Sequence, residues 1–359
     1  STELSNNGKW YTNLYQINDK PESKKDTVFN QLSEKISKEF YTDNNKTDVL
    51  YIHNVQNGLK YEIPDGRNPI FSDDSKWIAY KIVKEADKKD KDDKKKDTTY
   101  IELKNLASNF TVRYQSDASY SFPENKNYMI SYGKNDLLIY DLESRSEHFI
   151  GNVGEYLEDK NSEYIAYTIN TEDKRGNGIY LYNPKDRTTQ TVTTGNHIFS
   201  NLAWNSNGNA LAAYRYDEKE KDKKKEIDYK SINIIIVEDM DSKVSKLIKY
   251  SVKDIKEMPG DRGLAASPDK EEYDLIWSTD GQRLFVKLKK IDADKSEKTE
   301  DESTVQVWHW EDKKLLSERI MDAENDKDNT YRAIFFRDSN KIVPLTSEEI
   351  QNYIYSEGT

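Results

Sequence analysis

Short apolar runs alternate with short polar turns along the whole chain. The clearest example is residues 69–80, with the sequence PIFSDDSKWIAY. The side chains of Asp73, Asp74 and the serines beside them can bond to nearby backbone amides, which favours a tight turn. Trp77 and the three residues after it resume an apolar, β-prone run. This stretch predicts a β-hairpin.

The hairpin pattern recurs along the chain, with turns at residues 8, 75, 126, 162, 208, 281 and 339. A further strand-like run follows most copies, at residues 49–54, 137–142, 178–183, 232–237 and 305–310. Each of these runs leads through a polar turn to another β-prone segment, such as residues 189–193. Four strands in each repeat of about 40–50 residues are typical of a β-propeller blade.

The sequence therefore predicts an all-β fold. The expected architecture is a β-propeller of four-stranded blades, most simply seven of them, in a single domain over residues 1–359. The predicted blades are roughly residues 1–65, 66–114, 115–151, 152–195, 196–252, 253–320 and 321–359. The last blade has a first strand at 331–336, a second at 341–345 and room for one more, so we expect it to be incomplete at the C-terminus. Because an open ring would expose unpaired strand edges, we also expect the parent protein to continue beyond Thr359.

Three highly charged insertions, at residues 84–97, 217–228 and 292–302, separate the second and third strands of their blades. Such runs cannot bury apolar surface, so they are interpreted as solvated, mobile hairpin tips on one face of the propeller. The alternative is a charged collar that filters access to the channel or docks a partner.

The longest connection between predicted blades is residues 251–273, which contains Arg262, Glu271 and Glu272. It is either an ordinary long loop or a loop that contacts a ligand. If the second interpretation holds, these three residues are the candidate substrate-binding residues.

Composition narrows the class of protein. The net charge of −11 argues against non-specific nucleic-acid binding. No cysteine is present, which excludes a disulfide framework and a thiol nucleophile. The 25 Tyr, 10 Phe and 6 Trp suit sheets that pack face to face, and all tryptophans lie in the repeat motifs, so we expect them in the core between blades. No apolar run approaches the roughly 18 residues of a membrane span.

The sequence contains none of the common catalytic, metal-binding or phosphate-binding motifs. No Gly-x-Ser-x-Gly elbow occurs, and His53, His148, His197 and His309 are scattered over different predicted blades. No histidine spacing suggests zinc, and no glycine-rich phosphate loop precedes a helix. The sequence thus predicts no catalytic residue, no metal site and no cofactor in this chain.

Residues 71–80 (FSDDSKWIAY) and 307–312 (VWHWED) resemble the repeats of TolB-like propellers. More narrowly, they are similar to the N-terminal propeller of bacterial prolyl oligopeptidase family serine peptidases, and the resemblance spans essentially the whole chain. That family carries its Ser, Asp and His on an α/β-hydrolase domain, mostly C-terminal to the propeller, which this chain lacks. In the dipeptidyl-peptidase branch an acidic pair of the propeller domain binds the substrate N-terminus, and the pair Glu271 and Glu272 loosely resembles it.

The resemblance implies a non-catalytic propeller domain that gates or positions peptides for a hydrolase domain of the same parent chain. The expected partners are a peptide substrate or a protein partner, together with that C-terminal α/β-hydrolase domain. The alternative is a stand-alone TolB-like propeller that acts as a protein- or peptide-binding scaffold. Because the chain starts at Ser1 rather than Met, we expect a processed, periplasmic or otherwise extracytoplasmic protein.

Overall fold

The computed structural model describes residues 2–15, 48–84, 97–158, 161, 163–221, 224–239, 246–266, 275–291 and 330–347. Within these ranges the chain consists of β-strands and turns, and its one helical element is a single 3-10 turn, η1 (Val252–Asp254). The prediction of an all-β fold is confirmed. No helix in the described part is long and apolar enough to cross a membrane.

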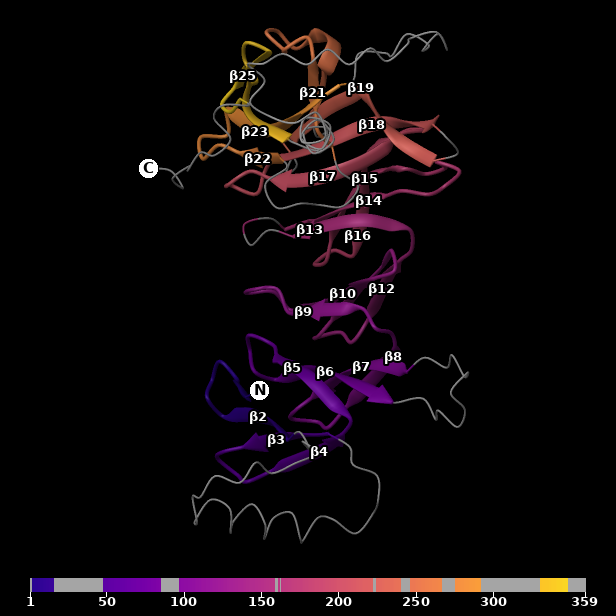
Figure 1. Cartoon of the computed structure of the whole chain (residues 1–359). Coiled ribbons are helices and arrows are strands. Elements are labelled where there is room, and N and C mark those ends of the chain that lie inside the picture. The colour runs from indigo at the N-terminus through magenta and orange to yellow at the C-terminus, as the bar shows by residue number, and fades with distance from the viewer. Residues whose placement is uncertain are drawn as a thin grey trace, which may run out of the picture. The chain divides into compact units, whose positions relative to one another are not determined.

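The chain divides into two compact units, Ser1–Ile150 and Gly151–Thr359, and each is described by itself. The first unit holds three four-stranded antiparallel sheets, β1–β4, β5–β8 and β9–β12 (Figure 1). Its strands are β1 (Thr2–Leu4), β2 (Trp10–Tyr15), β3 (Val49–Asn54), β4 (Lys60–Pro64), β5 (Gly66–Phe71), β6 (Trp77–Lys84), β7 (Thr98–Asn105), β8 (Thr111–Gln115), β9 (Ser119–Ser121), β10 (Tyr128–Gly133), β11 (Asp136–Asp141) and β12 (Glu147–Ile150).

The second unit holds the fourth sheet (β13–β16), the fifth sheet (β17–β20) and the sixth sheet, in the order β21-β23-β24-β25 with β22 also paired to β23. Its strands are β13 (Val153–Glu158), β14 (Ile165–Ile169), β15 (Gly178–Asn183), β16 (Thr188–Thr194), β17 (Ile198–Trp204), β18 (Leu211–Lys221), β19 (Lys224–Glu238), β20 (Lys246–Ser251), β21 (Arg262–Leu264), β22 (Leu275–Trp277), β23 (Arg283–Lys290), β24 (Thr330–Phe336) and β25 (Lys341–Pro344).

In the first five sheets each strand pairs with its neighbour in the sequence, in most cases across a short polar turn. A four-stranded meander of this kind is the unit of a β-propeller blade. The prediction of four-stranded blades is therefore confirmed. The described residues form five such sheets and a five-stranded sixth, and both the count of seven and the single domain stay predictions.

One strand assignment was wrong. Residues 331–336 and 341–345 were predicted as the first two strands of a seventh blade, but β24 pairs with β23, and β25 pairs with β24. They are thus the last two strands of the sixth sheet. A polar turn between two apolar runs marks any hairpin, whichever strands it joins, so the turn at 337–340 resembled those between first and second strands. The third strand expected at residues 305–310 lies outside the described residues.

The insertion at residues 217–228 is a hairpin, as expected. β18 and β19 continue as paired strands from Asp217 opposite Asp228 to Lys221 opposite Lys224, and the mobility of the insertion stays a prediction. Lys219 lies within 3.9 Å of the Asp228 carboxylate, an attraction between strands that favours pairing. Most of the other two insertions, residues 85–96 and 292–302, lies outside the described residues.

Apolar side chains fill the spaces between consecutive sheets within each unit. Trp10 and Ile52 of the first sheet pack with Tyr80 of the second, and Trp77 of the second packs with Met129 of the third. Burial of each such side chain contributes about 1.5–3 kcal/mol. In the second unit the same kind of core joins the fifth and sixth sheets and includes Trp277. The tryptophans that the structure describes therefore belong to the packing between sheets, as predicted, while residues 308 and 310 lie outside the described residues.

Candidate functional site

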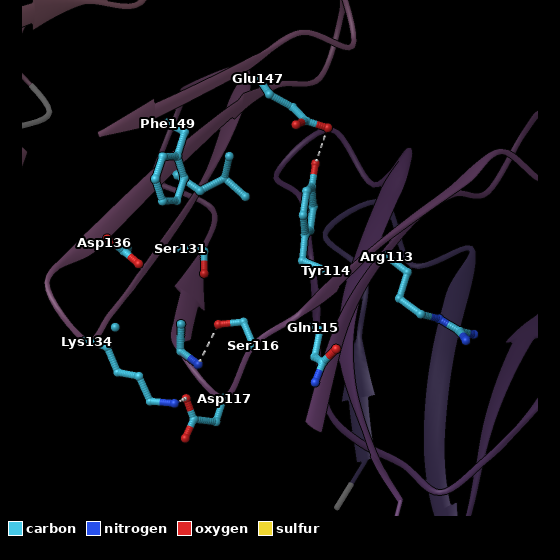
Figure 2. Close-up of a pocket in the computed structure, with 13 residues that line it drawn as sticks. Arg113, Tyr114, Gln115, Ser116, Asp117, Ser131, Lys134, Asp136, Glu147 and Phe149 are labelled. Atoms are coloured by element: carbon cyan, nitrogen blue, oxygen red, sulfur yellow. Dashed lines mark hydrogen bonds and ion pairs between the residues drawn. The ribbon is translucent and has the colours of Figure 1, made fainter. Parts of the chain in front are cut away.

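A pocket of about 540 Å³ lies in the first unit, between β8 of the second sheet and β10, β11 and β12 of the third (Figure 2). The segment that links β8 to β9 forms its floor, with Ser116, Asp117 and Ala118 among the lining residues. The volume falls within the roughly 300–1,000 Å³ of sites for small molecules and peptide side chains.

The pocket exists because side chains become smaller along β10. Successive strand residues point to opposite faces, so Met129, Ser131 and Gly133 share one face. Met129 is fully buried in the core with the second sheet. Ser131 and Gly133 line the pocket instead. A Cβ atom added to Gly133 would lie 2.7 Å from the Cβ of Ala118, so this wall does not accept a larger residue without moving the link.

The neighbouring strands add apolar and acidic groups to the same face. Ser131 pairs with Leu138, and Leu138 pairs with Phe149. Asp136 precedes Leu138 by two residues and Glu147 precedes Phe149 by two, so strand alternation puts both carboxylates on the pocket side. The Phe149 side chain is 64% exposed, although it is a large hydrophobic group.

Tyr114 of β8 reaches Glu147 from the opposite wall. Its hydroxyl donates a hydrogen bond of 2.7 Å to one oxygen of the Glu147 carboxylate. Burial, and next the bond to this carboxylate, hold the pKa of the Tyr114 hydroxyl well above its usual range. The tyrosine is therefore a neutral donor at any physiological pH, and it fixes the orientation of Glu147 at the pocket rim (Figure 2).

Some charged side chains around the pocket have an oppositely charged partner, and others do not. The Arg113 side chain points away from the hollow in Figure 2 and is bound by Glu102, with nitrogen–oxygen distances of 2.7 and 2.6 Å. Lys134 lies 3.5 Å from Asp117. Asp136 has no hydrogen bond or ion pair with any residue that the structure describes. The pocket therefore presents a net negative surface beside an exposed phenyl ring.

This arrangement suits binding. The pocket offers carboxylates, hydroxyls and apolar surface, and its lining residues include no histidine to activate a nucleophile. In the described parts of the chain, no three His, Cys, Asp or Glu side chains come together as a metal site would require.

Arg262, one of the predicted substrate-binding residues, lies in β21 opposite Lys290. Its side chain is only 13% exposed, and its guanidinium lies 3.9 Å from the ring centroid of Tyr331. A cation over an aromatic face contributes about 0.5–2 kcal/mol, so this contact joins β21 to β24. Its role toward a substrate stays a prediction.

The other two candidates, Glu271 and Glu272, lie outside the described residues, so the proximity of the three stays a prediction. The histidines are dispersed. His53 lies in β3 and His148 in β12, while His197 precedes β17 and bonds the Asp217 carboxylate at 2.6 Å. His309 lies outside the described residues.

The pocket was not predicted from the sequence. Its only signal is the loss of side-chain size from Met129 to Ser131 to Gly133, followed by Asp136 after a tight turn. This signal can be read only when the register of β10 and β11 is known, because the register decides which residues share a face.

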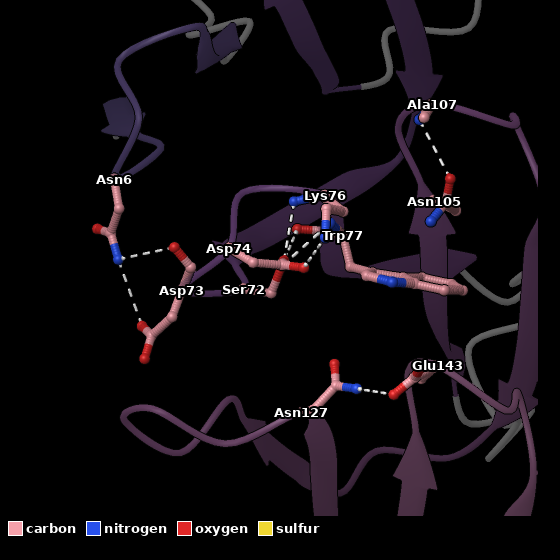
Figure 3. A network of polar contacts seen from close by, with 10 residues as sticks. All are labelled: Asn6, Ser72, Asp73, Asp74, Lys76, Trp77, Asn105, Ala107, Asn127 and Glu143. Atoms are coloured by element: carbon pink, nitrogen blue, oxygen red, sulfur yellow. Dashed lines mark hydrogen bonds and ion pairs between the residues drawn. The ribbon is translucent and has the colours of Figure 1, made fainter.

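The turn motif that repeats most clearly in the sequence shapes hairpins. The Ser72 hydroxyl donates to the Asp74 carboxylate at 2.7 Å, and this carboxylate accepts the Lys76 amide at 3.0 Å (Figure 3). The Trp77 amide in turn donates to the Ser72 hydroxyl at 3.0 Å. Ser75 holds a left-handed backbone, with φ at 57°. The motif thus satisfies the backbone groups of one tight turn.

The same bonds recur in the sixth sheet, where Ser278 and Asp280 take the places of Ser72 and Asp74. Neighbouring turns are also joined, because the Asn6 side chain donates to Asp73 at 3.3 Å in Figure 3. The repeat that identifies the blades therefore has a structural role in these two hairpins.

The folded units are blades of the β-propeller class, defined by their four-stranded meanders. No protein-family model matches the sequence, and no curated protein matches it. Among solved structures, the tricorn protease is similar over 83% of this chain and 29% of its own, with 10% identity and a TM-score of 0.39. The β-propeller domain of the Trilobed protease from Pyrococcus furiosus matches over 70% of this chain and 74% of its own, with 14% identity and a TM-score of 0.32.

TolB from Acinetobacter baumannii matches over 84% of this chain and 60% of its own, with 13% identity and a TM-score of 0.32. This chain spans less than two thirds of the tricorn protease and TolB chains that it matches. The chain thus resembles the propellers of peptidases and of TolB. Its own fold is established by its sheets.

Proposed function

We propose that this chain is the non-catalytic propeller domain of an extracytoplasmic peptidase of the prolyl oligopeptidase type. In this role it gates or positions peptides for an α/β-hydrolase domain of the same parent chain. The observation that supports the proposal is the pocket between the second and third sheets. It offers two uncompensated carboxylates and an exposed phenylalanine, which suits a peptide side chain better than a compact metabolite.

The blades provide a rigid frame for such a role. Ser131, Leu138 and Phe149 belong to three paired strands of one sheet, so their spacing is fixed by backbone hydrogen bonds rather than by a loop. A propeller domain that lacks its own nucleophile would contribute affinity and selection, while bond cleavage would take place on the hydrolase domain.

The proposal is tested by comparing the parent protein with a form from which this chain is deleted. We expect the parent to cleave short peptides and to spare long unfolded proteins, and we expect the deleted form to lose that selectivity. We further expect the isolated chain to bind peptides without cleaving them. Equal selectivity of the two forms, or peptide cleavage by the isolated chain, would contradict the proposal.

The second candidate is a stand-alone propeller that binds a protein or peptide as a scaffold. The exposed Phe149 favours it equally, because an exposed aromatic side chain at a pocket rim is a common anchor for a partner. The gene decides between the two. A coding region beyond Thr359 with a Gly-x-Ser-x-Gly motif supports the peptidase, and a stop codon directly after it supports the scaffold.

A further inference from the structure

The pocket is lined by a serine hydroxyl that has no partner among the described residues. Ser131 as a residue is 4% exposed and lines the hollow (Figure 2). Its oxygen is not one of the fully buried polar atoms that lack a hydrogen bond, so it reaches the open space of the pocket. The Ser131 hydroxyl is therefore available to a ligand.

The two carboxylates of the pocket define the charge of that ligand. Asp136 has no partner in the described residues, and Glu147 uses one oxygen for the Tyr114 hydroxyl. The nearby cations Arg113 and Lys134 are already paired with other acids. A group that donates several hydrogen bonds and carries a positive charge would complement these acceptors.

The apolar part of the pocket defines the rest of the ligand. Phe149 is 64% exposed, and Leu138 lies beside it on the neighbouring strand. Lysine and arginine side chains combine an apolar stem with a charged head, so one end can pack on such a surface while the other reaches the carboxylates. A single metal ion would leave the phenyl ring uncovered.

We propose that this pocket binds a lysine or arginine side chain of a peptide. The charged head donates to Asp136 and the Ser131 hydroxyl, the Glu147 carboxylate at the other end of the pocket adds a longer-range attraction, and the stem, or an apolar residue next to it in the peptide, packs on Phe149. The inference rests on the proposed function insofar as the ligand is a peptide. It adds to the proposed function the recognition of a basic residue, by residues other than the predicted Arg262.

The test measures binding of a dye-labelled peptide to the full chain by fluorescence anisotropy. The probe is an acetylated, amidated peptide with one lysine between leucines, and its match replaces lysine by norleucine. We expect the norleucine peptide to bind at least about tenfold more weakly, a difference of roughly 1.4 kcal/mol. Raising the salt concentration should weaken the lysine peptide and leave the norleucine peptide nearly unchanged.

Variants locate the binding. Glu147→Gln keeps an acceptor for the Tyr114 hydroxyl and removes the charge, and combined with Asp136→Asn it should reduce the affinity for the lysine peptide to that of the norleucine peptide. Ser131→Ala should weaken binding about fivefold, as expected for one lost hydrogen bond. The matched control is Asp186→Asn, an exposed acid in the β15–β16 turn of the other unit, and it should change nothing.

The outcomes separate the two proposals. If both peptides bind equally and the double variant changes neither, the basic-residue inference is wrong while peptide binding stands. If a lysine-free peptide with a free N-terminus binds as tightly as the lysine probe, the pocket recognises an amino terminus and the inference is likewise wrong. If no peptide binds at all, the peptide-handling function fails together with it.

Discussion

The space between the first and second sheets is filled beside Tyr80, whereas the space between the second and third is filled at Met129 and opens into the pocket beside Ser131. Both spaces are bounded by hairpins in the same position of their sheets. Trp77 pairs with Asn105, and Tyr128 pairs with Asp141. Three residues after these two aromatics, β6 carries Tyr80 and β10 carries Ser131.

Each of these two positions begins a row of residues that are paired across its sheet, and the two rows differ at every residue. In the second sheet, Tyr80 donates a hydrogen bond to Glu102, which also binds Arg113. Glu102 is 7% exposed, so this row forms a compact polar network behind the core. In the third sheet the corresponding row is Ser131, Leu138 and Phe149. The second and third sheets thus have the same strand pairing at these positions. The side chains in the two rows decide whether the space in front of each row becomes a core or a pocket.

The largest loss of stability is expected when the buried side chain in the row of the second sheet is truncated. Tyr80→Ser removes a fully buried ring and one of the two residues that donate hydrogen bonds to Glu102, so the free energy of unfolding should fall by about 3–5 kcal/mol. Tyr80→Phe keeps the ring and should cost only about 1–2 kcal/mol. Chemical denaturation of the two variants checks the difference. If Tyr80→Ser unfolded like the unaltered chain, the row would not be part of the core.

The next effect concerns the small residue in the wall of the pocket. Gly133→Ala should lower the free energy of unfolding by about 1–3 kcal/mol, because its new methyl group would lie 2.7 Å from Ala118 and must displace the link. The matched control is Gly260→Ala in the other unit, where an added Cβ atom meets no other atom within 4 Å. Denaturant midpoints measure both. A Gly133→Ala cost no greater than that of the control would show that the link yields freely.

Much of this architecture follows from the sequence. Alternating runs and the Ser72–Asp74 turn predict hairpins, because the turn chemistry is local and the strand period is two. The assignment of residues 331–345 failed because a hairpin signal does not state which strands it joins. The hairpin at residues 217–228 was expected, but how far its strands stay paired was not, because a run of charges suggests solvation and does not reveal cross-strand pairing.

The pocket could not be predicted for a different reason. Its cause is the difference between Tyr80 and Ser131, which has meaning only when the two strands are superimposed by register and when the sheet in front is known. The predicted candidates Glu271 and Glu272 came from a resemblance of sequence, which carries no information about distance to Arg262.

A smaller effect on stability and a large effect on binding are expected when a large side chain is placed in the row of the third sheet, which lines the pocket. Ser131→Tyr introduces at Ser131 the residue found at the corresponding place in β6, where it would occupy the space in front of Leu138 and Phe149. The pocket already provides the volume, so the free energy of unfolding should change by no more than about 1 kcal/mol. Binding of the lysine peptide should disappear. Retained binding would show that the peptide uses another surface.

The smallest effect tests whether the turns contribute to the difference between the two spaces. In the turn between the first two strands of the second sheet, Asp74 is titratable. The corresponding turn position in the third sheet is Asn125, which is not. Burial raises the pKa of the Asp74 carboxyl, but the hydrogen bonds from Ser72 and Lys76 outweigh it and leave this pKa below its usual value. The ionised form is therefore favoured by folding.

The sign of the pH effect follows from that direction. The contribution of Asp74 is fully present above the pKa of an unfolded aspartate, near 3.9, and is lost as the pH falls through the lower folded value. Asp74→Asn should remove this part of the acid sensitivity and cost at most about 1 kcal/mol near neutral pH, since the turn is partly exposed. Unfolding by denaturant at a series of pH values measures it, with Asp186→Asn as the control. Because the Asp74 carboxylate bonds to Ser72 and Lys76 of its own hairpin, peptide binding by Asp74→Asn should equal that of the unaltered chain. A loss of binding would show that the turn, and not the row that begins at Ser131, holds the pocket open.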